Sequence, residues 1–417
     1  MTSSTTTTSP DIPKTMRSWV STSFGNPRSA LSLLSDVPLP TLPANTNTAT
    51  PATPTHLLLK VSHVTLNPAD LVTIKLLPPW LPFRRSPVPA LDFAGEIVAV
   101  SGGSSSPTPG GEEAKGGAPK EEVGWKVGDR VCGAVGLKDV ARGKGSLAEY
   151  IVVDSGLVSK VPSLPATPSS SGKSAGGAGS VWEGAGAAGT MGIAGQTAWT
   201  MVRKAMGVEN GSAVLAALAL GKGEKGLEGK RILVSGASGG VGTILLQICR
   251  GLGAEAVVGI CSGASEELVK KLGAHEIVDY RQHSPLEPHL ATTFADSQFD
   301  VIFDCVGNQS LYTNSAKYLK PDGKFISIVG GMSQGVVPYV RNKILPLFFG
   351  GTSRSYELFL LSAAGETAKE VAALVESGVI TESLIDEEFP MEKAVEAFEK
   401  LATKRAKGKI VINLTHT

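Results

Sequence analysis

The feature that most constrains this chain is a glycine-rich turn that directly follows an apolar segment. Residues 231–235 are mostly apolar, residues 236–242 include four glycines, and residues 243–250 are apolar at helical spacing. A strand, a glycine turn and a helix in this order bring a pyrophosphate onto the backbone N–H groups at the helix N-terminus. The segment therefore predicts a dinucleotide-binding unit, and the alternative is a glycine-rich loop in an ordinary βα unit.

Three positions of the turn match the dinucleotide fingerprint, namely Ala237, Gly239 and Gly242. Gly239 lets the backbone approach the phosphates, and Gly242 lets the helix pack closely on the strand. Ala237 replaces the usual first glycine, so the pattern depends on its context between a strand and a helix. The predicted cofactor contacts in the turn are Ala237, Ser238, Gly239, Gly240, Val241 and Gly242.

The end of the next predicted strand indicates which dinucleotide fits. Residues 256–261 form this strand, and an NAD site normally has Asp or Glu at its tip to bind the ribose hydroxyls. This chain has Cys261, Ser262 and Gly263 there, so no carboxylate repels a 2′-phosphate and Ser262 can donate to it. The pattern favours NADP(H), although a loop without any ribose ligand would look the same.

Strands and helices continue to alternate after the turn. Further strands are predicted at residues 276–280, 299–306 and 323–329, with a helix at 266–272. This alternation predicts an α/β fold with a doubly wound parallel sheet, the Rossmann arrangement. Ligands of such sheets lie outside the carboxyl ends of the strands. The predicted cofactor contacts on these later loops are Val306, Val329 and Gly330.

Composition excludes several classes of function. The 39 basic and 38 acidic residues leave a net charge of +1 without a long basic block, so nucleic-acid binding is not expected. No apolar run is long enough to span a membrane, and no signal-peptide core is present. The four cysteines are scattered and suggest neither a metal site nor disulfides. We expect an intracellular monomer or homodimer acting on a small molecule, with the cytoplasm favoured and the mitochondrion as the alternative.

Before the glycine turn, short strands follow one another without helices, which predicts a β-rich domain. A helix at 391–401 and a strand at 409–413 return to it. The expected division is a disordered tract at 1–15, the β-rich domain at 16–194, the dinucleotide domain at 195–340, and the return to the first domain at 341–417. Gly-, Ser- and Pro-rich insertions are expected near 101–124 and 165–189.

Several short motifs together carry a family resemblance. They include Asn67 to Asp70, Leu91 to Glu96, Gly128 to Val131, Gly145 to Tyr150 and Gly195 to Ala198, besides the glycine turn, Leu272 to Ala274 and Asp279 to Tyr280. The chain resembles the medium-chain dehydrogenase/reductase superfamily, in its zinc-free quinone oxidoreductase-like branch. The resemblance implies a GroES-like β-rich domain around an NADP(H)-binding Rossmann domain, with catalysis between them. The histidine and the cysteine loop of zinc-dependent relatives are missing, so no metal is expected.

By resemblance, Asn67 and Thr197 line the nicotinamide end of the cleft, and Ser262 and Tyr280 lie near the 2′-phosphate. The alternatives are a loop cap for Asn67 and a sheet-edge aromatic for Tyr280. Asp70 and Glu149 are interpreted as structural carboxylates, and no proton donor is assigned. Relatives often place a lysine or asparagine shortly after the Ser262 position; this chain does not, so Arg281 is an alternative source of charge.

These features predict an NADPH-dependent reductase of a quinone or an α,β-unsaturated carbonyl that works without zinc. One alternative is an enoyl reductase of lipid or polyketide assembly, but Val72 stands where such relatives often have lysine. Another is a cofactor-binding protein without turnover. Trp80, Phe83 and Tyr339 indicate an apolar substrate pocket, with surface or core packing as the alternative for each.

Overall fold

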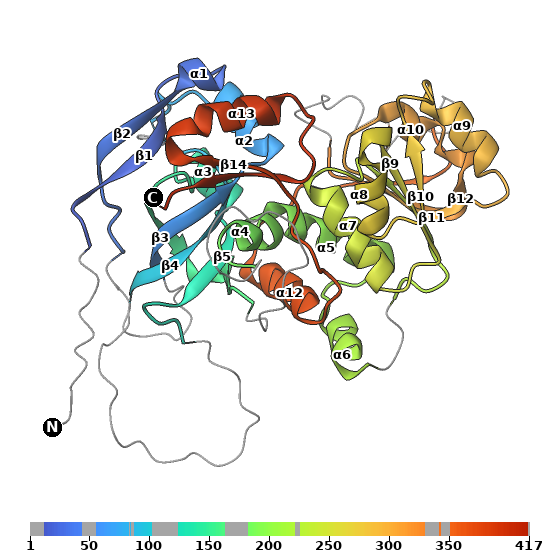
Figure 1. The fold of residues 1–417 in the computed structure, drawn as a ribbon, viewed down its shortest axis with the longest axis horizontal. Helices are drawn as coiled ribbons and strands as arrows, with labels where there is room; N and C mark the ends of the chain where they lie inside the picture. The colour runs from blue at the N-terminus through green and yellow to red at the C-terminus, as the bar shows by residue number, and fades with distance from the viewer. Residues whose placement is uncertain are drawn as a thin grey trace, which may run out of the picture.

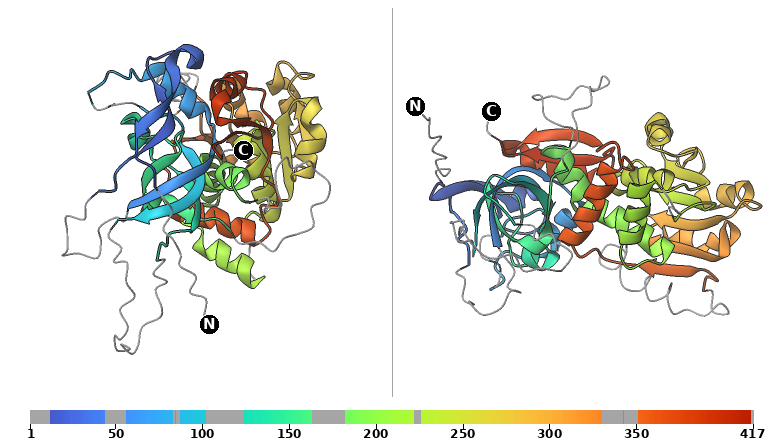
Figure 2. Two further views of the ribbon diagram at one scale, coloured as in Figure 1. Left: turned by 60° about the vertical axis from the view of Figure 1, so that its left-hand side comes forward. Right: turned by 90° about the horizontal axis from the view of Figure 1, so that it is seen from below.

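The computed structural model describes residues 12–43, 56–82, 84, 87–101, 124–162, 182–221, 226–329, 342 and 351–415. Two sheets lie side by side, with the helices α4 (Ala185–Met191), α5 (Ile193–Met206) and α12 (Gly365–Glu376) between them (Figures 1 and 2). The β-rich lobe is drawn mainly in blue and cyan, and the lobe with the glycine turn mainly in yellow and orange. The chain passes from the first lobe to the second and then returns.

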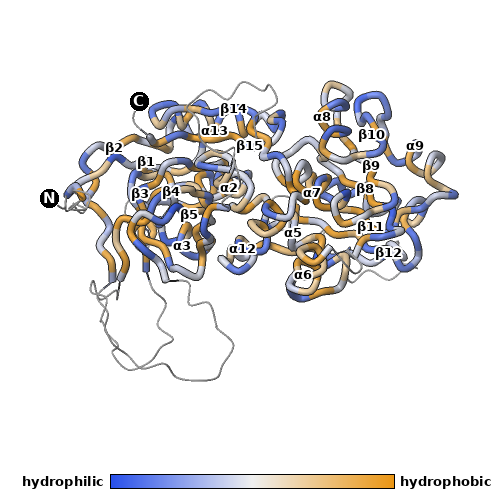
Figure 3. Tube along the Cα trace, turned by 60° about the horizontal axis from the view of Figure 1, so that its bottom comes forward, coloured by the Kyte–Doolittle hydropathy of each residue, from blue (hydrophilic) through white to orange (hydrophobic). Residues whose placement is uncertain are grey.

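The second lobe is built on a six-stranded parallel sheet in the order β10-β9-β8-β11-β12-β13. The strands are β8 (Arg231–Ser235), β9 (Ala256–Cys261), β10 (Glu276–Asp279), β11 (Phe299–Asp304), β12 (Leu319–Ser327) and β13 (Ser355–Leu358). The middle residues of the central strands β8 and β11 are apolar because helices cover both faces of the sheet, and Leu233 and Ile302 are completely buried. Figure 3 shows this apolar centre in orange. The predicted α/β fold with a Rossmann sheet is confirmed.

The strand β13 corrects one expected boundary. Residues 341–417 were assigned to the β-rich domain, but Ser355–Leu358 pairs in parallel with β12 and forms an edge of the six-stranded sheet. The segment was missed because it is short and contains Ser355 and Glu357. The return to the first lobe therefore begins after this strand.

The first lobe contains a seven-stranded sheet in the order β14-β15-β3-β4-β5-β7, with β6 paired to β3. Its strands are β3 (His56–Thr65), β4 (Asp92–Val100), β5 (Arg130–Ala134), β6 (Tyr150–Asp154), β7 (Val158–Lys160), β14 (Ile385–Pro390) and β15 (Lys409–Asn413). A separate pair, β1 (Thr15–Ser21) and β2 (Leu31–Pro38), is antiparallel. The C-terminal β15 pairs with β3, so the chain end completes this sheet.

Two helices between the sheets correct a second boundary. Residues 165–181 of the insertion expected near 165–189 lie outside the described residues. The last residues of the expected insertion belong to α4 (Ala185–Met191), which is a buried helix. Its small residues resemble a glycine-rich loop in sequence, yet they allow the close packing of this helix against β3 and β5. The next helix, α5 (Ile193–Met206), spans the expected boundary at 195 and packs on α7 (Gly240–Gly251). Of the other expected insertion, residues 102–123 lie outside the described part.

The helix α6 (Ser212–Leu220) lies between α5 and the glycine turn in the sequence. The other α-helices of the described segments are α1 (Pro27–Ala30), α2 (Pro68–Leu76), α3 (Leu137–Ala141), α8 (Glu266–Lys271), α9 (Leu286–Thr293), α10 (Gln309–Thr313), α12 (Gly365–Glu376) and α13 (Ala394–Ala402). Within the described residues, none of the helices has the length and apolar character needed to cross a bilayer.

Candidate dinucleotide site

The glycine turn joins β8 to α7 at the carboxyl end of the parallel sheet. Gly236 has a φ of +78°, which favours glycine, and its carbonyl accepts a hydrogen bond from the Gly239 N–H at 3.0 Å. The helix starts at Gly240, three residues before the apolar run that predicted it. The turn itself therefore supplies the first N–H groups of α7, which have no partner within the helix.

The glycines of the turn differ in what surrounds them. A β-carbon at Gly242 would lie 2.2 Å from the Gly236 carbonyl oxygen, so the close packing of helix on turn requires glycine here. A β-carbon at Gly239 would meet only that same oxygen, at 3.4 Å, which is ordinary contact. The fold does not itself demand glycine at Gly239. Apart from that oxygen and the two chain neighbours, the atoms of the described residues lie more than 4 Å from such a β-carbon.

Polar side chains gather at the ends of the two neighbouring strands. Ser262 Oγ lies 3.4 Å from Ser265 Oγ. Tyr280 is 47% exposed, and the guanidinium carbon of Arg281 lies 5.8 Å from the centre of its ring. These residues come from the loops after β9 and β10, which are adjacent in the sheet. The structure thus brings Ser262 and Tyr280 to the same edge, with a cation beside them.

A carboxylate does occur at this edge, on the strand next to the one inspected in the sequence. Asp279 Oδ1 accepts from the Arg281 N–H at 2.9 Å, and Oδ2 accepts from Gln282 Nε2 at 3.1 Å. The backbone N–H of Arg281, followed by that of Gly263, lowers the pKa of Asp279. Its oxygens hold the two loops together, which makes this carboxylate a loop-fixing group.

Sequence reasoning missed Lys407, which lies at the same edge. Its Nζ donates to the Ala264 carbonyl at 2.8 Å, and the side chain is exposed. Lys407 therefore stands beside the turn that holds Ser262 and Ser265. No local motif could have placed it there, because 143 residues separate it from Ala264.

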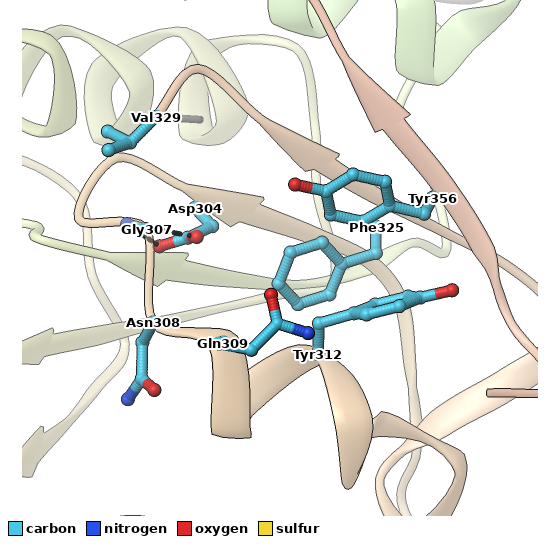
Figure 4. Close-up of a pocket in the computed structure, with 8 residues that line it drawn as sticks. All are labelled: Asp304, Gly307, Asn308, Gln309, Tyr312, Phe325, Val329 and Tyr356. Carbon is cyan, nitrogen blue, oxygen red and sulfur yellow. Dashed lines mark hydrogen bonds between the residues drawn. The ribbon is translucent and has the colours of Figure 1, made fainter. Parts of the chain in front are cut away.

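The loops after β11 and β12 enclose a small recess (Figure 4). Its lining residues are Asp304, Gly307, Asn308, Gln309, Tyr312, Phe325, Val329 and Tyr356. Asp304 fixes the loop after β11 by accepting from the N–H groups of Val306 and Gly307, both at 3.0 Å. Burial raises the pKa of Asp304. Val306 is 57% exposed on this edge, while Gly330 lies outside the described residues.

On the other side of the glycine turn lies a buried polar cluster of the β-rich lobe. Asp92 is completely buried, and its Oδ2 accepts from Thr65 Oγ1 at 2.8 Å, Asn67 Nδ2 at 2.8 Å and Lys409 Nζ at 3.1 Å. Its Oδ1 accepts from the Ile193 N–H at 2.8 Å, at the start of α5. Lys409 Nζ also donates to Asn67 Oδ1 at 2.6 Å. This cluster, called the Asp92 cluster below, joins α2, β4, α5 and β15.

A second carboxylate, Asp70, adjoins the Asp92 cluster. Its Oδ2 accepts from the Asn67 N–H at 2.6 Å, and its Oδ1 is buried without a hydrogen-bond partner. Burial, reinforced by the charge of Asp92, raises the pKa of Asp70 to about 8. Burial and the neighbouring carboxylate both favour the protonated form of Asp70.

The other expected site residues are placed as follows. Thr197 lies in α5, one turn after Ile193, and is 4% exposed. Asn67 is 5% exposed and precedes α2, with its amide bound to the Asp92 cluster. Trp80 is 72% exposed, which favours the surface alternative for it. Phe83 and Tyr339 lie outside the described residues.

Comparison with known proteins agrees with this arrangement. The family model described as "Alcohol dehydrogenase GroES-like domain" matches residues 53–163, and the one described as "Zinc-binding dehydrogenase" matches residues 272–412. The chain is 30% identical over 406 residues to the medium chain reductase pydE of an Acremonium species, covering 96% of this chain and 99% of that protein. The chain belongs to the medium-chain dehydrogenase/reductase superfamily. The resemblance inferred from the motifs is thus confirmed.

Matches to other members of this superfamily cover a similar share of the chain. The trans-enoyl reductase poxH of Penicillium oxalicum is 28% identical over 418 residues, covering 96% of this chain and 98% of that protein. The quinone oxidoreductase of Coxiella burnetii has the same fold, with a TM-score of 0.66 at 22% identity and coverage of 96% and 99%. As a superfamily member, the chain is an oxidoreductase that depends on a pyridine nucleotide.

Proposed function

We propose that this protein is an NADPH-dependent reductase that delivers hydride to a quinone or an α,β-unsaturated carbonyl without zinc. The observation that carries the proposal is the glycine turn at the carboxyl end of β8, where a β-carbon on Gly239 would contact only the Gly236 oxygen and close packing requires glycine at Gly242. The turn lies beside Ser262 on one side and the Asp92 cluster on the other. A dinucleotide bound there would extend from the strand edge toward the β-rich lobe.

The preference for NADPH over NADH rests on the charge at the ends of β9 and β10. Lys407 donates to the Ala264 carbonyl in the loop that begins at Ser262, Arg281 lies over the Tyr280 ring, and the carboxylate of Asp279 is engaged by backbone N–H groups. The 2′-phosphate of NADPH carries up to two negative charges. Cations and a hydroxyl donor in the protein therefore favour this phosphate over the uncharged 2′-hydroxyl of NADH. We infer that Ser262, Lys407 and Arg281 provide this selectivity, with Tyr280 alongside.

The proposal of zinc independence rests on the side chains available as ligands. The described residues contain no group of three or more His, Cys, Asp or Glu placed to hold a metal ion. Asp92 lies in the segment where zinc-dependent relatives carry a histidine, and its oxygens are already occupied by Thr65, Asn67 and Lys409. An ammonium in contact with Asp92 opposes the binding of a second cation there.

The chemistry follows from a reaction that needs no Lewis acid. When bound, the reduced nicotinamide supplies a hydride to the electrophilic carbon of the acceptor, and a proton from water completes the reduction. The residues of this chain then have binding and positioning roles. The glycine turn holds the phosphates, and Asp304 holds the loop that carries Val306. The Asp92 cluster fixes Asn67 at the start of α2.

An enoyl reductase is the second candidate, and the observation that favours it is the trans-enoyl reductase poxH among the relatives. The relative pydE is named only as a medium chain reductase and does not separate the two. Val72 in α2 counts against the enoyl substrate, because relatives that reduce enoyl thioesters often have a lysine there. Cofactor binding without turnover is the third possibility.

The proposal is tested with the purified protein and a panel of acceptors. NADPH and NADH affinities are measured by fluorescence titration, and NADPH oxidation is followed by absorbance with quinones, enones and enoyl thioesters. We expect tighter binding of NADPH and turnover with quinones or enones. Turnover with enoyl thioesters alone would support the second candidate, and NADPH binding without any turnover would support the third. Equal or tighter binding of NADH would contradict the proposed selectivity.

A further inference from the structure

Lys409 lies between the glycine turn and the Asp92 cluster. A β-carbon on Gly240, the first residue of α7, would lie 2.8 Å from Lys409 Cδ, so the lysine stem passes directly over the turn. The ammonium at the end of the stem reaches Asn67 and Asp92. The residue is 5% exposed, although lysine is rarely buried unless it is paired. One side chain therefore contacts both the candidate dinucleotide site and the β-rich lobe.

The backbone beside Lys409 is attached to the same turn. The Gly408 N–H donates to the Ser238 carbonyl at 2.9 Å, and Gly408 forms a parallel bridge with Gly239. Gly408 has a φ of +94°, and a β-carbon there would lie 2.3 Å from the Leu384 carbonyl oxygen. This position therefore requires glycine. These contacts hold the backbone next to Lys409 against the turn.

At its other end, Lys409 fixes the amide of Asn67. Asn67 Oδ1 accepts from Lys409 Nζ at 2.6 Å, and Asn67 Nδ2 donates to Asp92 Oδ2 at 2.8 Å. With both ends of the amide engaged, its orientation is set by the lysine and the carboxylate together. The Asn67 N–H binds Asp70 at 2.6 Å, so the same residue also orders the first turn of α2.

We propose that Lys409 is a positioning residue that couples occupancy of the glycine turn to the arrangement of Asn67 and Asp92. This inference rests on the proposed dinucleotide site. The ammonium is the cation that faces Asp92 in the described part of the chain, with Thr65, Asn67 and the Ile193 N–H as the neutral donors. Without the ammonium, Asp92 would be a buried carboxylate lacking its charge partner, which is strongly unfavourable. Cofactor binding and cleft geometry are therefore linked through one ion pair.

The test compares the wild-type protein with Lys409→Met, which keeps an apolar stem over Gly240 but removes the ammonium. The matched control is Lys160→Met, because Lys160 Nζ lies 3.0 Å from Asp129 Oδ2 in a half-exposed pair of the same lobe. Hydrogen–deuterium exchange is measured with and without NADPH over residues 237–243 and 67–70. Kinetic constants and NADPH affinity are measured in parallel, with circular dichroism as the folding control.

In the wild-type and Lys160→Met proteins, we expect NADPH to slow exchange by about threefold or more in both segments. In Lys409→Met, we expect protection at 237–243 alone, with kcat reduced by about tenfold and the NADPH affinity changed less than kcat. If Lys409→Met does not fold, the double variant with Asp92→Asn removes both charges and serves instead. Protection at 67–70 that persists without the ammonium would overturn the inference, as would its absence in the wild type. Absence of protection at 237–243 in the wild type would overturn the dinucleotide site itself.

Discussion

Replacing Asp70 with asparagine should stabilise this protein at neutral pH. Asp70 is completely buried, its Oδ1 has no partner, and its pKa is raised from 3.8 to about 8. The folded state must therefore keep a proton that the unfolded chain releases above about pH 4. In Asp70→Asn, the amide oxygen can still accept from the Asn67 N–H. The amide N–H groups of asparagine take the place of the unpartnered O–H of the acid. The main change is therefore that residue 70 no longer has an ionisable side chain.

The magnitude follows from linkage between protonation and folding. When the pKa of a carboxyl group is higher in the folded state, the free energy of unfolding is greatest below the pKa of the unfolded state. It then falls progressively as the pH rises to the pKa of the folded state. The loss is about 1.4 kcal/mol per pH unit. Between pH 3.8 and pH 7, the free energy of unfolding of the wild type thus falls by about 4 kcal/mol, and that of Asp70→Asn does not. We expect nearly equal stabilities at pH 4, and a difference that grows to about 4 kcal/mol at pH 7.

Urea denaturation at several pH values between 4 and 8 measures this difference. The control is Asp154→Asn, because the Asp154 carboxylate accepts from the Gly156 N–H at 2.7 Å in an exposed turn. The control should show no comparable increase with pH. If Asp70→Asn and the wild type have parallel pH profiles, the pKa of Asp70 is not raised in the folded protein.

Three further predictions concern the cofactor and the metal. Lys407→Gln should weaken NADPH binding by about tenfold while leaving NADH affinity nearly unchanged, because only the 2′-phosphate gains from the charge; equal weakening of both cofactors in a fluorescence titration would refute this role. Ser262→Asp should narrow or invert the cofactor preference by repelling the 2′-phosphate, and an unchanged ratio of dissociation constants would place the phosphate elsewhere. Elemental analysis of the purified protein should find no stoichiometric zinc, and chelators should leave the melting temperature and activity unchanged; one zinc per chain would contradict the interpretation of residues 91–96.

Local patterns in the sequence predicted the elements that form the dinucleotide lobe. The strand at 231–235, the glycine turn and the following helix are specified by neighbouring residues, because strand, turn and helix preferences act over a few positions. Buried parallel strands read as continuous apolar runs for the same reason, as at 256–261. The short edge strand Ser355–Leu358 and the helix Ala185–Met191 lacked such signals, since one is polar and the other is rich in Gly and Ala.

The site was predicted less completely because its residues meet through long-range contacts. Lys409 and Asn67 are 342 positions apart, and their contact depends on the return of β15 to the first lobe. The strand 409–413 was predicted, but its sequence does not show that its lysine faces a buried carboxylate. The role of Asp279 was also hidden, because its hydrogen bonds depend on how the loops after β9 and β10 lie together.

The most direct test of the central claim is a pair of valine variants in the glycine turn. Gly239→Val places a side chain where its β-carbon meets only the Gly236 oxygen at 3.4 Å, whereas in Gly242→Val the same oxygen lies 2.2 Å from the β-carbon. Circular dichroism and NADPH fluorescence titration are measured for both. We expect Gly239→Val to fold with a nearly unchanged melting temperature and to lose NADPH binding, and Gly242→Val to be destabilised. If Gly239→Val binds NADPH as the wild type does, the cofactor does not lie on this turn and the proposed function loses its main support.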